Sequence, residues 1–166
     1  MSADTAAGTS RREQIIKAVQ AETGIDEPMV ERLVRRFYEQ VREDDVIGPV
    51  FAERIQDWEP HLRRMCDFWS SVTLMSGRYR GQPMRVHLAL PVGGRHFDRW
   101  LALFESTARN ECPPNAAEYF IERARRIAQS LEFGIGAARG VLLGAGDRLQ
   151  WQGDAGAGTS TPLAVR

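Results

Sequence analysis

Hydrophobic residues recur every three or four positions along most of the chain, and this spacing places them on one face of an α-helix. A clear stripe of this kind consists of Val30, Leu33, Val34, Phe37 and Val41. Asp26 precedes the stripe and has a side chain suited to a helix N-cap, with Pro28 in the first turn. Tyr38 lies on the edge of the stripe. The pattern predicts an amphipathic helix that begins after Asp26 and buries one face.

The same spacing predicts further helices over about 12–22, 57–75, 95–110 and 115–139. Glycine and proline residues separate these segments at 48–49, 77–83, 91–94 and 113–114. The peptide "VHLAL" at 86–90 resembles a short strand, but the sequence offers no convincing partner strand for it. The expected fold class is therefore all-α, with residues 1–12 as a disordered lead.

Histidines are the main candidates for chemistry, and the chain has three of them, His61, His87 and His96. His87 lies in "GQPMRVHLALP", where glycines and prolines restrict the path of the segment. Its neighbours Leu88 and Leu90 indicate an apolar setting. An imidazole held rigidly beside an apolar cavity is what a haem iron requires. The alternative is a half-exposed loop histidine without a special role.

The other two histidines have different settings. His61 is directed inward on a helix face that also carries Trp58, Met65, Phe68 and Val72. It is either a core histidine with an internal hydrogen bond or a polar contact in a ligand pocket. His96 begins a helix and is expected near the surface or as a cap. Tyr38 and Trp100 are either core aromatics or a pair of hydrogen-bond donors that face a bound ligand.

Composition narrows the function classes. The 166 residues suggest one domain, and 22 basic against 22 acidic residues argue against a nucleic-acid binder. No apolar run approaches the ~20 residues of a membrane span, and no leader peptide is visible, so a cytoplasmic protein is expected. Cys66 and Cys112 are far apart and are predicted to be free thiols. Phosphate-binding glycine motifs and zinc-ligand spacings are absent from the sequence.

Four segments in sequence order resemble the group III truncated haemoglobins, which are bacterial globins with a two-over-two helical sandwich around haem. These segments are "RFYEQVREDDVIGPVF", "DWEPHLRRMCDFWSSV", "GRYRGQPMRVHLALP" and "HFDRWLALF". The resemblance covers about residues 28–139 and implies haem b (iron protoporphyrin IX) as the cofactor. It divides the chain into an N-terminal extension over 1–26, partly helical or disordered, a globin domain over 27–143 and a flexible tail over 144–166.

The resemblance also implies a role for each matching residue. His87 matches the proximal iron ligand, because "HLALP" fits the family pattern H-x-x-L-P, and His96 is its main rival. Tyr38, His61 and Trp100 match the distal polar residues. The apolar haem contacts fall on Phe51, Met65, Phe68 and Leu90. Arg64 and Tyr79 are candidates for binding the haem propionates.

The function implied by the resemblance is the binding of O₂ and other diatomic ligands, CO and NO among them. A pocket rich in donors argues against simple oxygen delivery, since strong hydrogen bonds retain O₂. Alternatives are a redox enzyme, peroxidase-like or oxidising nitric oxide, which needs a separate reductase, and a gas or redox sensor. Outside haem proteins, the alternative is a helical interaction module without a cofactor. The sequence leaves the oligomeric state open, as a monomer or a dimer.

Overall fold

The computed structural model describes residues 4–151, with side chains from residue 11 onward. This part of the chain forms helices and contains no strand, so the expected all-α class is confirmed. The helices are α1 (Asp4–Thr23), α2 (Glu27–Glu43), α3 (Gly48–Ala52), α4 (Trp58–Leu74), α5 (Pro83–His87), α6 (Gly94–Glu111) and α7 (Pro114–Ala138). None of these helices is both long and apolar enough to cross a membrane.

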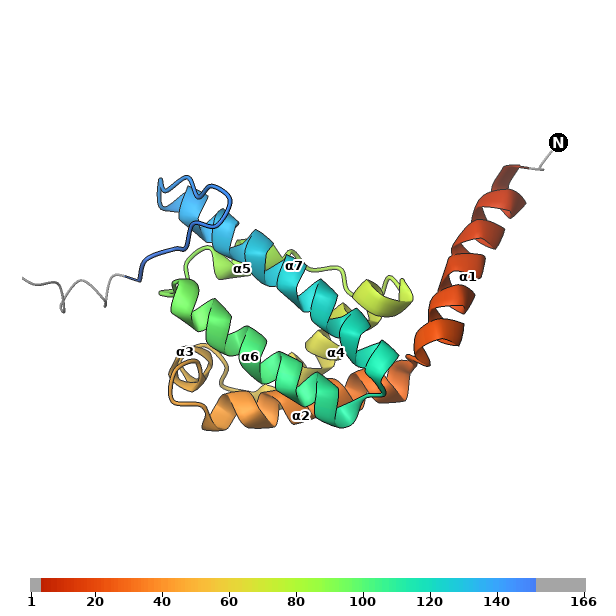
Figure 1. The fold of residues 1–166 in the computed structure, drawn as a ribbon, viewed down its shortest axis with the longest axis horizontal. Coiled ribbons are helices and arrows are strands. Elements are labelled where there is room, and N and C mark those ends of the chain that lie inside the picture. The colour runs from red at the N-terminus through yellow and green to blue at the C-terminus, as the bar shows by residue number, and fades with distance from the viewer. Residues whose placement is uncertain (1–3, 152–166) are drawn as a thin grey trace, which may run out of the picture.

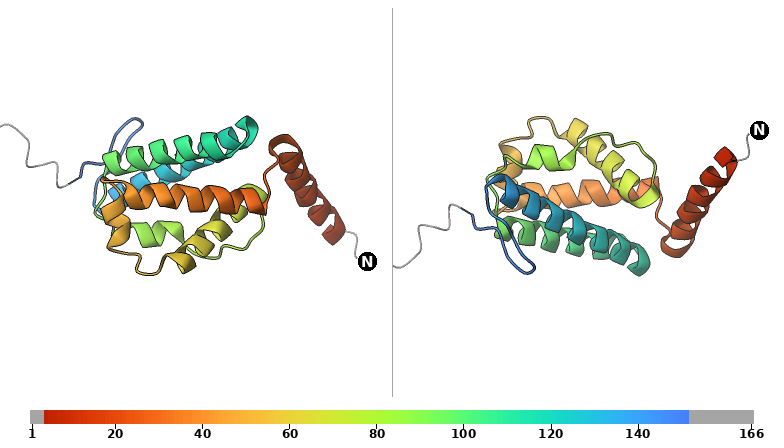
Figure 2. Two further views of the ribbon diagram at one scale, coloured as in Figure 1. Left: turned by 90° about the horizontal axis from the view of Figure 1, so that it is seen from below. Right: turned by 90° about the horizontal axis from the view of Figure 1, so that it is seen from above.

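Two helix pairs form the body of the molecule. Helices α6 and α7 lie side by side, and α2 packs against both α6 and α4 (Figures 1 and 2). Aromatic rings join the pairs at the centre, where Trp69 stacks on Phe104 at a centroid distance of 4.8 Å and Phe37 meets Phe104 edge-on at 5.2 Å. Offset and edge-to-face contacts are the favoured geometries of aromatic pairs. The predicted stripe of α2 is buried against this centre.

Helix starts and ends follow local signals where those signals are strong. Asp26 caps α2 as predicted, since its carboxylate accepts a hydrogen bond from the Met29 amide at 2.9 Å. Helix α4 is followed by its C-cap Met75, which takes the left-handed conformation with φ 53°. The short helix α3, which contains Phe51, was not predicted, because five residues are too few to show a helical period.

The first helix is longer than the sequence pattern predicts. Helix α1 begins at Asp4 rather than near residue 12, and it projects from the body in all three views (Figures 1 and 2). A helix that projects into solvent needs no apolar face, and residues 4–11 carry no apolar stripe. The hydrophobic pattern therefore could not predict the first turns of α1. Two hydrogen bonds join it to the body: Arg12 donates to the Met75 carbonyl, and the Asn115 amide donates to the Glu22 carbonyl at 3.2 Å.

Residues 144–151 differ from the flexible tail predicted over 144–166. Leu149 is buried, and its carbonyl accepts from the Gly94 amide at 2.7 Å. Arg148 pairs with the buried carboxylate of Glu132 at 3.1 Å, and the Leu149 amide donates to the same carboxylate at 2.9 Å. A buried carboxylate needs such partners, and they lie far from it in sequence. The remainder of the predicted tail, 152–166, lies outside the described residues.

Replacing Glu132 by alanine is expected to destabilise the protein. The buried Leu149 amide donates to the Glu132 carboxylate at 2.9 Å and loses this partner in the variant. Leaving a buried donor without a partner lowers the free energy of unfolding by about 1–3 kcal/mol. Denaturant unfolding followed by circular dichroism measures the change. Glu122→Ala is the matched control, because Glu122 is exposed on α7 and its ion pairs among the described residues are with Arg123 and Arg126. Equal destabilisation by the two substitutions would contradict this account of residues 144–151.

Candidate functional site

A cavity of about 340 Å³ lies between the two helix pairs, within the ~300–1,000 Å³ typical of small-molecule sites. Side chains from α2 through α7 line it, and most of them are apolar. The structure brings together at this cavity all the side chains predicted from the sequence to contact a cofactor. These are Tyr38, Phe51, His61, Arg64, Met65, Phe68, Tyr79, His87, Leu90 and Trp100.

The short helix α5 positions His87 at one side of the cavity. Pro83 starts this helix, and its carbonyl oxygen lies 2.6 Å from the His87 Nδ1 atom. A carbonyl only accepts hydrogen bonds, so Nδ1 must carry the hydrogen. In the neutral imidazole, Nε2 then keeps its lone pair. His87 therefore has the tautomer of a metal-binding histidine whose other nitrogen is held by a backbone carbonyl.

Helix α4 brings His61 into the same cavity, packed edge-on against the ring of Tyr38 at 5.0 Å and that of Trp58 at 5.8 Å. Burial lowers the pKa of His61 to about 4, and the positive charge of Arg64 adds to this effect. The imidazole is therefore neutral at pH 7. Its Nε2 atom is buried and has no hydrogen-bond partner among the described residues. Buried polar atoms nearly always have a partner, so this nitrogen indicates a group that the cavity receives.

Tyr38 and Trp100 supply two further polar groups. Tyr38 is buried, and this burial raises the pKa of its phenol well above the ordinary value, so the hydroxyl stays protonated. Trp100 is half-buried and stacks on Phe104 at 5.4 Å. Both residues line the cavity, where the O–H and N–H groups are donors. The site thus holds neutral donors in an apolar wall.

His96 was expected near the surface or as a cap; it is not at the surface, and it caps the start of α6. It is buried, it lines the cavity, and its Nδ1 accepts from the Gly93 amide at 3.0 Å. Trp151 packs edge-on against its ring at 5.3 Å, because residues 144–151 cover the start of α6. Since Nδ1 accepts, the hydrogen of a neutral His96 sits on Nε2. His87 and His96 therefore present opposite tautomers, and only His87 keeps an Nε2 lone pair.

Arginines stand at the rim of the cavity. Arg64 from α4 and Arg54 from the turn after α3 both line it and are exposed. Tyr79 reaches the rim from the loop after α4, where its amide donates to the Ser71 hydroxyl at 2.9 Å. Arg54 was not predicted, because nothing in the sequence indicates that the turn after Phe51 returns to the cavity.

The donor set does not suit a bare metal ion. Among residues 4–151 no group of three or more histidine, cysteine, aspartate or glutamate side chains could hold one. The cavity instead combines His87, whose Nδ1 is held by the Pro83 carbonyl, with a large apolar wall and cationic side chains at the rim.

Comparison with known proteins decides the family. The family described as bacterial-like globin matches residues 22–132. The chain belongs to the bacterial-like globin family. The match begins at the end of α1 and ends within α7, so it leaves out most of α1 and residues 144–151.

This globin is 32% identical over 113 residues to the group 3 truncated hemoglobin ctb of Campylobacter jejuni, covering 65% of this chain and 89% of that protein. The crystal structure of the group III truncated hemoglobin from Campylobacter jejuni superposes with a TM-score of 0.62, over 64% of this chain and 88% of that one. A thermostable hemoglobin from the actinobacterium Thermobifida fusca, 27% identical, matches with a TM-score of 0.56 over 63% and 89% of the two chains. The resemblance to group III truncated haemoglobins is confirmed.

Proposed function

We propose that this globin binds haem b in the cavity and uses His87 as the iron ligand. The observation that carries the proposal is the hydrogen bond between His87 Nδ1 and the Pro83 carbonyl at 2.6 Å, because in the neutral ring it leaves Nε2 with a lone pair that can bind a metal. The family supports it, because globins hold haem iron through a proximal histidine. His96 lines the same cavity but carries its hydrogen on Nε2, so it is the weaker candidate.

The residues present fit a haem group. Phe51, Met65, Phe68 and Leu90 give the apolar slot that a macrocycle needs. Arg64 and Tyr79, and now Arg54, stand at the rim, where a guanidinium or phenol binds a propionate carboxylate. The buried, unpartnered Nε2 of His61 gains a partner when the cavity is filled.

Haem iron, when bound, supplies an open coordination position for diatomic ligands such as O₂, CO and NO. The chain's own residues then govern retention of the ligand. Tyr38 and Trp100 offer hydrogen-bond donors from the apolar wall, and His61 stays neutral beside them. Because hydrogen bonds to an anionic acceptor are strong in a poorly solvated site, we infer slow O₂ release rather than rapid oxygen delivery.

A peroxidase-like activity is the second candidate, and the state of His61 favours it. A neutral imidazole with an unpartnered nitrogen can accept a proton from a peroxide that enters the cavity. Sustained turnover needs electrons from a separate reductase or a small reductant. Steady-state turnover of an electron-donor dye with hydrogen peroxide, compared between the native protein and His61→Leu, separates this candidate from a pure ligand binder.

An absorption spectrum of the purified protein tests the proposed function directly. We expect a Soret band in the oxidised protein that shifts on reduction and again on addition of carbon monoxide. These shifts report an iron with a position open to ligands. A protein that purifies without haem and fails to bind added haem at one to one would overturn the proposal and leave a helical interaction module.

A further inference from the structure

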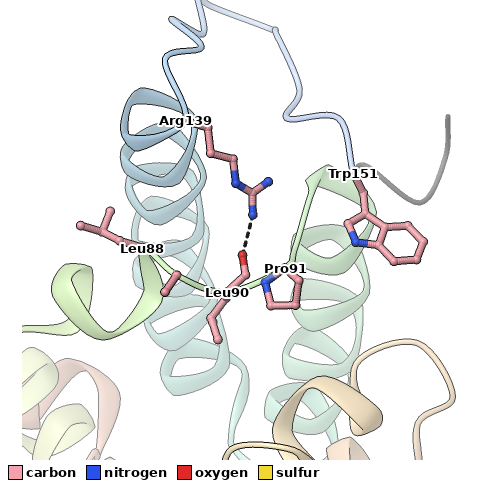
Figure 3. A pocket seen from close by; sticks show the side chains of 6 residues that line it. Leu88, Leu90, Pro91, Arg139 and Trp151 are labelled. Atoms are coloured by element: carbon pink, nitrogen blue, oxygen red, sulfur yellow. Dashed lines mark hydrogen bonds between the residues drawn. The ribbon is translucent and has the colours of Figure 1, made fainter.

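The segment that follows His87 is fastened to the end of α7 by a single arginine. The guanidinium of Arg139 donates from Nη2 to the Leu90 carbonyl at 2.5 Å and from Nη1 to the Val92 carbonyl at 2.9 Å. Figure 3 shows the first of these bonds, with the arginine reaching across from α7 to the chain at Leu90 and Pro91. One side chain thus binds the backbone on both sides of Pro91.

These bonds connect to the imidazole of His87 through the backbone. The Leu90 amide donates to the His87 carbonyl at 3.0 Å, and His87 Nδ1 is bonded to the Pro83 carbonyl. The guanidinium of Arg139 is thus connected to His87 Nδ1 through three hydrogen bonds: Arg139 to Leu90, Leu90 to the His87 carbonyl, and His87 Nδ1 to Pro83. A charged donor gives shorter and stronger bonds than a neutral one, so the arginine provides the firmest link of this series.

Burial alone does not hold this segment in place. Helix α5 has five residues and none of them is buried, while Val86 is 69% exposed and Leu88 is 37% exposed. Helices of so few residues are marginal without packing. The outer side of residues 88–91 borders a second cavity of about 360 Å³, whose wall includes Arg139 and Trp151 (Figure 3). Few side chains therefore support the segment from outside.

Helix α7 provides a second support on the other side of His87. A Cβ atom at Gly134 would lie 2.2 Å from the sulfur of Met84, so the glycine leaves the space in which the Met84 side chain rests. Met84 precedes His87 on α5, and the Leu90 and Val92 carbonyls that Arg139 binds follow His87. Helix α7 thus contacts the chain on both sides of His87. The Met84 side chain packs on Gly134 before it, and Arg139 hydrogen-bonds the backbone after it.

We propose that Arg139 is a positioning residue for His87. By holding the backbone after His87, Arg139 sets the orientation of the imidazole and thereby the strength of the bond between the imidazole and iron. The proposal rests on the proposed function, in which His87 binds haem iron. Loss of the guanidinium frees the Leu90 and Val92 carbonyls, and residues 88–92 relax toward the cavity in Figure 3. The imidazole then samples several orientations instead of one.

Resonance Raman spectra of the reduced, ligand-free holoprotein test the proposal through the iron–histidine stretching band. Arg139→Met is expected to shift and broaden this band and to change the rate of carbon monoxide binding. Arg139→Lys, which keeps the charge but not the two-pronged donor, is expected to give an intermediate band. Arg139→Lys keeps a cationic side chain at the same place. Its band therefore tests whether Arg139 orients His87 even when Arg139→Met loses haem.

Arg148→Met is the matched control. Arg148 lies near the same end of the molecule and pairs with Glu132 and Asp98. Its backbone hydrogen bond goes to the Gly94 carbonyl and not to the carbonyls that Arg139 binds. We expect this variant to unfold at a lower temperature with an unchanged band. An unchanged band in Arg139→Met, or an equal change in Arg148→Met, would overturn the role of Arg139 alone. A native protein without an iron–histidine band would overturn the proposed function itself.

Discussion

His87→Ala is expected to lose haem at least roughly 100-fold faster than the native protein. Loss of a partner in the outer shell of a metal site already costs about 10–100-fold in affinity, so loss of the ligand itself should cost more. The apolar slot and the rim arginines remain in this variant and slow the loss, but they offer the iron no nitrogen. Transfer of haem to an excess of an acceptor apoprotein, followed by absorption, measures the rate.

His96→Ala is the matched control, because both histidines line the cavity and only one has a free Nε2. We expect it to retain haem with a native-like spectrum. Imidazole added to His87→Gly should restore the spectrum, since the small molecule can occupy the space of the lost ring. Retention of haem by His87→Ala together with its loss from His96→Ala would reverse the assignment.

Tyr38→Phe is expected to speed O₂ release. The substitution removes a donor in a buried site and keeps the ring, and a buried hydrogen bond of this kind contributes about 1–3 kcal/mol, or roughly 5–150-fold in rate. Trp100→Phe removes the second donor and is expected to act in the same direction. Stopped-flow mixing of the oxygenated protein with carbon monoxide gives the dissociation rate.

Tyr119→Phe serves as the control for these rates. Tyr119 is half-buried on α7 against Arg123 and does not line the cavity, so its hydroxyl should not affect O₂ release. The distal-donor account requires that at least one of Tyr38→Phe and Trp100→Phe releases O₂ faster than this control. Dissociation rates equal to the control in both variants would show that neither group bonds the ligand.

The helices of the body could be predicted because each buries an apolar stripe with the period of its own backbone. The stripe of α2 ends in the core as its spacing requires, and Asp26 caps the helix through a contact only three residues away. The ten predicted cofactor contacts also meet at one cavity, since the resemblance carried their order and spacing. Their roles toward haem stay predictions for the experiments above.

Contacts between distant residues decided the rest, because local patterns carry no record of them. The buried ring of His96 packs against Trp151, which lies more than fifty residues further along the chain. Arg148 finds its carboxylate on α7, so a segment that looks like a tail is packed. Arg139 reaches Leu90 and Val92 only because α7 returns past α5. The sequence by itself determined the helices and the set of candidate residues. Tertiary structure decided which residues are covered and by what, since only packing between distant segments removes a side chain from water.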